Sequence, residues 1–146
     1  MYCREITYGS PTYAEAVALR DIVLRLPLDL EFTESQIGNE YGVYHIGAFT
    51  SDGTLIGILI GQPIEGNKDV IKIRQVAVEP SLHSRGVGTQ LMQYAESFFQ
   101  QAGYSSCTLN ARVVSSNFYK RCNYKVEGEE FLEVGIPHLK MTKKLV

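Results

Sequence analysis

The chain has 146 residues, of which 45% are hydrophobic and 21% are charged, and its formal net charge is −2. This length fits one domain, residues 1–146, with a single sizeable core, and the composition is too apolar for a disordered chain. Because the charge balance is slightly acidic, no basic field would draw the whole molecule to nucleic acid or an anionic membrane. Any binding of a polyanionic ligand must therefore rest on a local site.

Cysteine usage and the N-terminus predict a cytoplasmic protein without a metal site. Cys3, Cys107 and Cys122 cannot all pair with one another, and their spacing matches no zinc-binding pattern. Residues 1–5 lack the basic and apolar segments of a signal peptide. No run approaches the ~20 apolar residues that cross a bilayer. We therefore expect a reducing compartment and no membrane partner.

The first part of the chain predicts a strand, a helix and a hairpin. Ser10 and Pro11 are typical of a helix start, because a hydroxyl can cap the helix and proline fits its first position. Apolar residues then recur at helical spacing, and Ser51-Asp52-Gly53 is typical of a hairpin turn. The expected elements are a strand containing residues 6–8, a helix over 11–25 that Pro27 ends, a polar loop with a short helix over 28–42, and strands over 41–49 and 54–61.

The second part of the chain alternates strands and helices. The expected elements are a strand over 69–79 that Pro80 ends, a helix over 86–102 closed by Gly103, a strand over 104–111, a helix over 115–122, and two strands on either side of 135–137. The long helix has an apolar face made of Val87, Leu91, Ala95, Phe98 and Ala102. This order predicts an α/β (α+β) fold, a mixed sheet with helices on both faces.

Two glycines, Gly86 and Gly88, flank one residue where the long helix begins. Glycines let a ligand approach the backbone closely, and the N–H groups of a first helical turn can bind an anion such as a pyrophosphate. His83 and Arg85 add side-chain donors. The pattern by itself also fits a plain strand-to-helix turn, whereas the glycine spacing fits neither a Rossmann site nor a P-loop.

The strand before this loop changes its phase. Ile71 and Ile73 fall on one parity, and Val76 and Val78 fall on the other. A β-bulge near residues 74–75 would produce this shift and would free backbone groups to pair with an extended, amide-containing ligand. A strand buried on both faces would produce it too. A pyrophosphate site with an amide-binding strand beside it describes coenzyme A.

Residues 83–88, His-Ser-Arg-Gly-Val-Gly, resemble the phosphate motif Gln/Arg-x-x-Gly-x-Gly/Ala of the GNAT superfamily of acyl-CoA-dependent N-acyltransferases, with His83 in place of Gln or Arg. Residues 118–124 are similar to the family's Phe-Tyr-x-x-x-Gly-Phe. Asn123 there replaces the glycine, and asparagine also adopts the left-handed conformation readily. The tail with Gly-Ile-Pro-His at 135–138 resembles a subgroup of small single-domain bacterial N-acetyltransferases. The resemblance extends over residues 43–145.

The resemblance implies an acyl-CoA N-acyltransferase-like sheet, mostly antiparallel, with a bulged and splayed central strand, and acetyl-CoA as the cosubstrate. It also implies that the backbone near residues 75–78 binds the pantetheine arm and that Tyr119 is the general acid for the leaving thiolate. Asn110 and Asn117 bond either the pantetheine amides or their own backbone. The cofactor-binding residues expected on this basis are Gln75, Val76, Ala77, Val78, His83, Ser84, Arg85, Gly86, Val87, Gly88, Thr89, Asn110, Asn117 and Tyr119.

The general base is less evident than the acid. Many members of the family carry a glutamate on the bulged strand, but Arg74 stands there in this chain, and an arginine takes up no proton at neutral pH. His138, Glu133 and His45 are the candidates, acting directly or through water; alternatively, the amine arrives neutral. We assign the catalytic role to His138, although a strand histidine bonded to backbone would look the same in sequence.

The sequence therefore predicts an acetyl-CoA-dependent N-acetyltransferase that transfers acetyl to a primary amine of a small molecule or peptide, by direct attack in a ternary complex. The alternative is a non-catalytic CoA-binding or regulatory module on the same fold, because the strand glutamate is missing. An unrelated α/β phosphate-binding domain is the third interpretation. A homodimer is common on this architecture, although no sequence feature requires one, and the acceptor is not identified.

Overall fold

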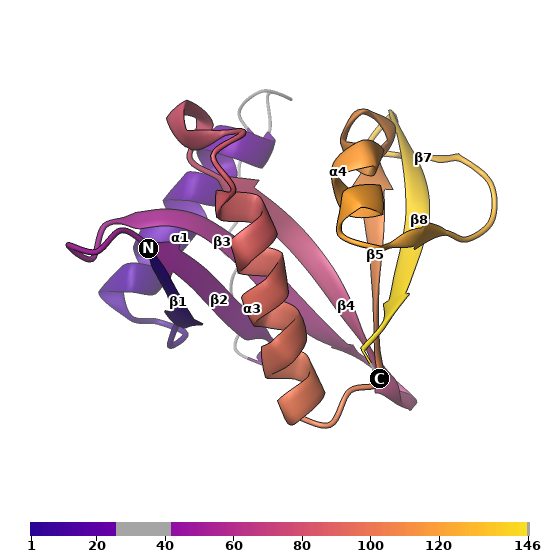
Figure 1. Cartoon of the computed structure of the whole chain (residues 1–146), viewed down its shortest axis with the longest axis horizontal. Helices are drawn as coiled ribbons and strands as arrows, with labels where there is room; N and C mark the ends of the chain where they lie inside the picture. Colours follow the sequence, from indigo (N-terminus) through magenta and orange to yellow (C-terminus); the bar gives the residue numbers. More distant parts are fainter. Residues whose placement is uncertain (26–41, 146) are drawn as a thin grey trace. The chain divides into compact units, whose positions relative to one another are not determined.

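The computed structural model describes residues 1–25 and 42–145, and Figure 1 labels their helices and strands. Contacts divide the chain into two compact units: a first unit of residues 1–62 and 75–95, and a second unit of residues 63–74 and 96–146. Hydrogen-bonded strands follow the order β1-β2-β3-β4-β5-β8-β6, with β7 also paired to β8. In the described ranges, no helix has the length and hydropathy to span a bilayer.

The first unit begins with three antiparallel strands, β1 (Tyr2–Glu5), β2 (Tyr44–Phe49) and β3 (Leu55–Ile64). The turn between β2 and β3 is the predicted one, and its Gly53 has a φ of +91°. The predicted first strand at residues 6–8 was wrong, because β1 lies four residues earlier and ends at Glu5. Ile6 still donates to the His45 carbonyl, but the chain then turns through Gly9, whose φ is +78°.

Helix α1 (Pro11–Arg20) starts where the sequence predicts, because the Ser10 hydroxyl accepts from the Tyr13 amide at 3.1 Å and Pro11 occupies the first turn. The predicted helix over 11–25 is α-helical only to Arg20 and continues as a π-helical turn over Asp21–Arg25. The predicted stop at Pro27 and the predicted loop and short helix lie outside the described residues, apart from Gly42.

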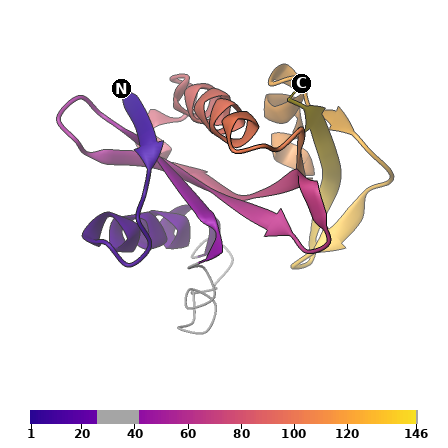
Figure 2. The ribbon, with the colours of Figure 1, turned by 90° about the horizontal axis from the view of Figure 1, so that it is seen from below.

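Helices lie on both faces of the strands of the first unit, as Figure 2 shows for α1 and α3. Ile58 belongs to a buried cluster with Tyr13 and Ala16 of α1. Its neighbour Gly57 points the other way, since a Cβ built there would meet Val87 at 3.4 Å and Leu91 at 3.5 Å. These are ordinary van der Waals distances, so the first half of α3 packs directly over this position of β3.

Strand β4 (Asn67–Val78) and helix α3 (Val87–Gln101) each contribute residues to both units. Gly103 closes α3 as predicted, with a φ of +104°, and Tyr104 donates to the Phe99 carbonyl. The predicted apolar face is correct at Val87, Leu91 and Ala95, all buried, but wrong at its end. There Ala102 is exposed and Phe99 is fully buried, because the stripe drifts around the helix.

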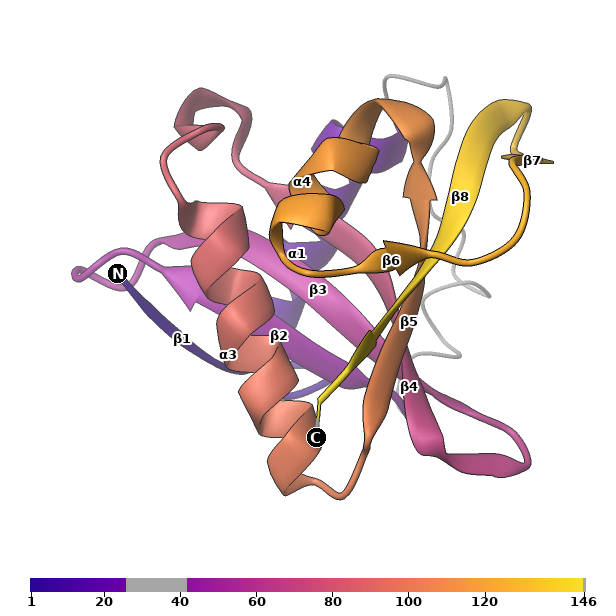
Figure 3. The ribbon, with the colours of Figure 1, turned by 45° about the vertical axis from the view of Figure 1, so that its right-hand side comes forward.

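In the second unit, residues 70–73 of β4 pair in parallel with β5 (Ser106–Arg112), and β8 (Ile136–Lys144) runs antiparallel to β5. Two short strands, β6 (Lys125–Val126) and β7 (Phe131–Glu133), both pair with β8 (Figure 3). The sequence did not predict β6. Between β5 and β6 stands α4 (Ser116–Arg121), preceded by a 3₁₀ turn at Val113–Ser115.

A polar network is buried in the second unit. The Tyr124 hydroxyl donates to one carboxylate oxygen of Glu96 at 2.9 Å, and the Lys143 ammonium donates to the other at 2.7 Å. Glu96 is only 8% exposed and Tyr124 only 2%, so the carboxylate depends on these donors in place of water. Burial raises the pKa of the Cys107 thiol nearby from 9.0 to about 12.

Candidate functional site

Strand β4 leaves the extended conformation at Gln75, where the sequence predicts a bulge. Gln75 has a φ of +56°, in the left-handed region, which costs a residue with a side chain about 1–2 kcal/mol. Its side-chain oxygen is buried and has no hydrogen-bond partner among the described residues. Beyond Gln75, Ala77 packs into the core of the first unit, while Val76 and Val78 are half-buried. A strained, under-bonded residue in a strand is a candidate functional feature.

The loop after β4 is tied to the strands of its own unit. The Glu79 amide donates to the Ile56 carbonyl at 2.8 Å, and the Glu79 carboxylate accepts from Ser81. The His83 ring places Nε2 at 2.9 Å from the Val78 carbonyl, and since a carbonyl only accepts, Nε2 carries the proton. His83 therefore closes the loop onto the strand instead of extending away from it.

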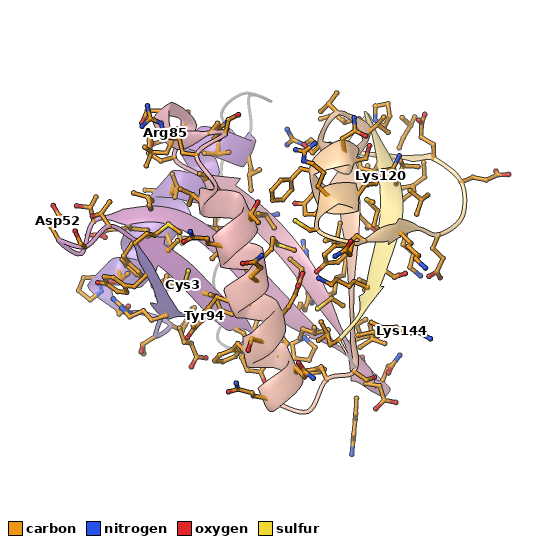
Figure 4. The ribbon with its side chains drawn as sticks, in the orientation of Figure 1. Cys3, Asp52, Arg85, Tyr94, Lys120 and Lys144 are labelled. Atoms are coloured by element: carbon orange, nitrogen blue, oxygen red, sulfur yellow. The ribbon has the colours of Figure 1, made fainter. Side chains whose placement is uncertain are left out.

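The start of α3 presents free backbone donors. The first intrahelical bond runs from the Gln90 amide to the Gly86 carbonyl, so the N–H groups of residues 87–89 have no partner within the helix. Gly86 has a φ of +81°, and a Cβ built there would meet nothing within 4 Å. Ser84 is also left-handed, with a φ of +65°, and Arg85 projects from the loop in Figure 4. This open cradle of amides fits a phosphate group.

In the second unit, Glu133 brings together two residues that the sequence singled out separately. Asn110 donates its side-chain amide to one Glu133 oxygen at 3.4 Å, and His138 Nε2 lies 3.4 Å from the other. His138 Nδ1 lies 2.7 Å from the Ile136 carbonyl, and Phe131 stacks on the ring. The sequence did not predict this cluster. Asn110 and His138 lie on adjacent strands, and only the register of β5, β8 and β7 makes the contact visible.

Tyr119 lies on α4 in the second unit, half-buried between the rings of Phe118 and Tyr124. The chain after α4 turns through Asn123, whose φ of +72° confirms the predicted left-handed asparagine. The Tyr124 amide then donates back to the Tyr119 carbonyl at 3.0 Å. Burial raises the pKa of the Tyr119 phenol above its ordinary value of 10.0, so the hydroxyl keeps its proton at neutral pH.

The sequence also singled out Asn117, Arg74 and His45. Asn117 is exposed in the first turn of α4, and Arg74 is exposed on β4. His45 is 4% exposed and packs against the rings of Tyr8 and Tyr13, which places it in the core of the first unit. No group of three or more His, Cys, Asp or Glu side chains in the described ranges is arranged to hold a metal ion.

The chain is thus a mixed α/β protein with a left-handed residue, Gln75, in strand β4. The open loop at Gly86, between β4 and α3, has a geometry that suits a phosphate-bearing ligand. Residues 30–145 match the family described as acetyltransferase (GNAT) domain, and the chain belongs to that family. Acetyl-CoA is the acyl donor that GNAT acetyltransferases use.

Relatives in sequence come from Bacillus subtilis. The N-acetyltransferase YjcF is 41% identical over 73 residues, which cover 49% of this chain and 52% of YjcF. The N-acetyltransferase YitI is 28% identical over 132 residues, covering 87% of this chain and 88% of YitI. The alignments with YjcF and with two further relatives span about half of each of those proteins.

Solved structures confirm the fold. Escherichia coli ElaA superposes with a TM-score of 0.82 at 20% identity, covering 97% of this chain and 98% of ElaA. An aminoglycoside 6′-N-acetyltransferase complexed with coenzyme A gives a TM-score of 0.80 at 19% identity, covering 100% of this chain and 98% of that protein. The predicted mixed, mostly antiparallel sheet with helices on both faces is therefore confirmed.

Proposed function

We propose that the chain is an acetyl-CoA-dependent N-acetyltransferase that moves an acetyl group to a primary amine of a small molecule or peptide. The observation that carries this proposal is the open amide cradle at Gly86, in the loop after a strand whose Gln75 is left-handed. The family match over residues 30–145 includes residues of both units, which supports one N-acetyltransferase domain over 1–146. We also assign it to the small single-domain bacterial subgroup, on the resemblance of its Gly-Ile-Pro-His tail at 135–138.

Binding of the cosubstrate rests on backbone more than on side chains. The amides of residues 84–89 receive the pyrophosphate at the positive end of the α3 dipole, and Arg85 adds a fixed charge. The backbone of residues 75–78 pairs with the pantetheine amides, and Asn117 adds a side-chain contact. His83 acts by holding the loop against Val78 rather than by reaching the phosphate.

Acetyl transfer needs a neutral amine, a bound thioester and a proton for the thiolate that leaves. Tyr119 supplies that proton, because its phenol is protonated at neutral pH and can donate as negative charge develops on sulfur. The amine attacks the thioester directly, in a ternary complex. Cys107 and Cys122 take no part as nucleophiles, since burial raises the pKa of both thiols and the thioester is already activated.

His138 is the proposed acceptor for the proton that the amine loses. The ring is fixed with Nδ1 donating to the Ile136 carbonyl, which leaves Nε2 as its basic nitrogen. The ring is 5% exposed, so neighbouring side chains cover it.

The experiment is acetyl-CoA turnover with a panel of primary amines, comparing the wild type with Tyr119→Phe and with Tyr94→Phe, a tyrosine exposed on α3. We expect Tyr119→Phe to lower kcat by about 10²–10⁴-fold and Tyr94→Phe to leave it unchanged. CoA binding, measured by calorimetry, should survive in both variants. A wild type that neither binds CoA nor consumes acetyl-CoA contradicts the proposal.

A non-catalytic CoA-binding module is the second candidate. The observation that favours it is Arg74, an exposed arginine on β4 at the position where a glutamate base was expected. CoA binding without acetylation of any amine in the panel would establish this candidate and exclude the first.

A further inference from the structure

We propose that Asn110, Glu133 and His138 form the subsite that receives the acceptor, and that it takes a primary alkylamine arriving as its ammonium ion. This inference rests on the proposed function and adds the group that first contacts the amine. Among the three side chains, that group is Glu133.

Glu133 and His138 differ in their solvent exposure, and this difference gives them different roles. The His138 side chain is only 6% exposed, whereas the Glu133 side chain is 47% exposed. An incoming ammonium can therefore reach the Glu133 carboxylate but not the His138 ring behind it. Since one Glu133 oxygen accepts from Asn110, the carboxylate is held in one orientation with its other oxygen toward His138 Nε2.

The hydrogen bonds around His138 leave its Nε2 atom able to take up one proton. The Ile136 carbonyl fixes the proton on Nδ1, so in the neutral ring Nε2 presents a lone pair to a carboxylate oxygen 3.4 Å away. Two acceptors then face each other with no proton between them. A proton taken up from the amine binds Nε2 and converts the pair into an imidazolium hydrogen-bonded to a carboxylate.

The proton inventory of the reaction is balanced by these groups. An ammonium N–H bond breaks as an O–H bond forms on Glu133, and the proton passes to His138 Nε2, leaving a neutral amine that attacks the thioester. The second amine proton is lost as the amide forms and replaces the one that Tyr119 gives to the thiolate. The proton on the Glu133–His138 pair returns to solvent through the exposed carboxylate, so one proton is released per turnover.

Other charged residues lie on the same strands as the pair. Arg112 of β5 lies opposite His138 in the β5–β8 register. Lys140 of β8 forms an ion pair with Glu127 at 3.4 Å. Glu133 is thus the carboxylate paired with His138, and Glu127 is a chemically identical carboxylate paired with a lysine on the same strand.

The hairpin that carries Glu133 is short and tightly constrained. Two residues, Val134 and Gly135, connect β7 to β8 with φ values of +48° and +73°. Both residues are left-handed, as in a type I′ turn, which fixes the register of the two strands. The turn therefore holds Glu133 and the Ile136 carbonyl on either side of His138.

The test compares Glu133→Gln, His138→Gln and the double variant with Glu127→Gln as the matched control. The probe is Nα-acetyl-lysine amide, a primary alkylamine, or the best amine of the panel. We expect each single variant to lose about 10²-fold in kcat/KM and the double variant to lose no more than either, because the two residues act as one unit. Glu127→Gln should keep the wild-type rate.

Two further readouts separate this role from a structural one. The fall in kcat/KM toward low pH, expected as the pair takes up its proton, should disappear in Glu133→Gln, and added formate should restore part of the rate of Glu133→Gly. CoA affinity and the melting temperature of Glu133→Gln should equal those of the wild type. A Glu133→Gln enzyme with the wild-type rate and pH profile overturns this inference alone. A wild type that acetylates no amine overturns the proposed function as well.

Discussion

The buried carboxylate of Glu96 makes Tyr124→Phe a sharp test of how the second unit is held together. The substitution removes one hydroxyl group and leaves the ring, so it opens no cavity of appreciable size. What it removes is the donor at 2.9 Å from one Glu96 oxygen. Lys143 continues to donate to the other oxygen at 2.7 Å.

The expected loss follows from burial. Glu96 is 8% exposed and Tyr124 is 2% exposed, so water does not readily replace the missing donor. A hydrogen bond to a charged, buried acceptor contributes about 1.5–3 kcal/mol, and an unsatisfied buried group costs about as much. We therefore expect Tyr124→Phe to lower the free energy of unfolding by about 2 kcal/mol, which corresponds to about 4–8 °C in Tm for a chain of this size.

The assay is urea unfolding followed by circular dichroism, with Lys140→Met as the control. Lys140 also forms an ion pair, with Glu127 at 3.4 Å, but both side chains are about half exposed. Exposed pairs contribute about 0–1 kcal/mol, so the control should change the free energy of unfolding by less than 1 kcal/mol. A Tyr124→Phe variant as stable as the control would refute the argument that the Glu96 carboxylate depends on its buried donors.

Two further predictions concern stability. Burial raises the pKa of the Cys107 thiol and of the Tyr124 phenol, so the folded state keeps protons that the unfolded chain loses above pH 9–10. Because the folded state then binds more protons, the free energy of unfolding falls as pH rises through this range. A urea midpoint unchanged between pH 7 and pH 10.5 would contradict this. Val134→Asn should raise the free energy of unfolding by about 1 kcal/mol, because a β-branched residue with a φ of +48° is strained and 66% exposed. A melting temperature equal to or below that of the wild type would count against it.

Positions with a left-handed backbone at helix ends could be predicted from the sequence. Gly86, Gly103 and Asn123 were each predicted at a helix end, and all three are left-handed, with φ values of +81°, +104° and +72°. The phase change in β4 likewise predicted a β-bulge near residues 74–75, and Gln75 there is left-handed, with a φ of +56°. These positions are identifiable because few residue types adopt the conformation that a turn, a cap or a bulge requires.

Features that depend on strand pairing between distant residues could not be predicted from the sequence. The first strand was predicted four residues late, because its bounds follow from its register with residues 46–49. The two-residue strand β6 has no periodicity of its own and exists through its pairing with Met141 and Thr142. The contact of Asn110 with Glu133 also depends on strand register, so the sequence did not predict this bond to a carboxylate.

We expect the backbone amides at the start of α3 to bind the phosphates of coenzyme A. A titration of the ¹⁵N-labelled protein with CoA, followed by amide ¹H–¹⁵N correlation spectra, tests it residue by residue. Saturable shifts are expected, largest at the amides of residues 84–89 and of residues 75–78 in β4. Binding that leaves the amides of residues 84–89 unshifted, or no binding at all, would contradict it.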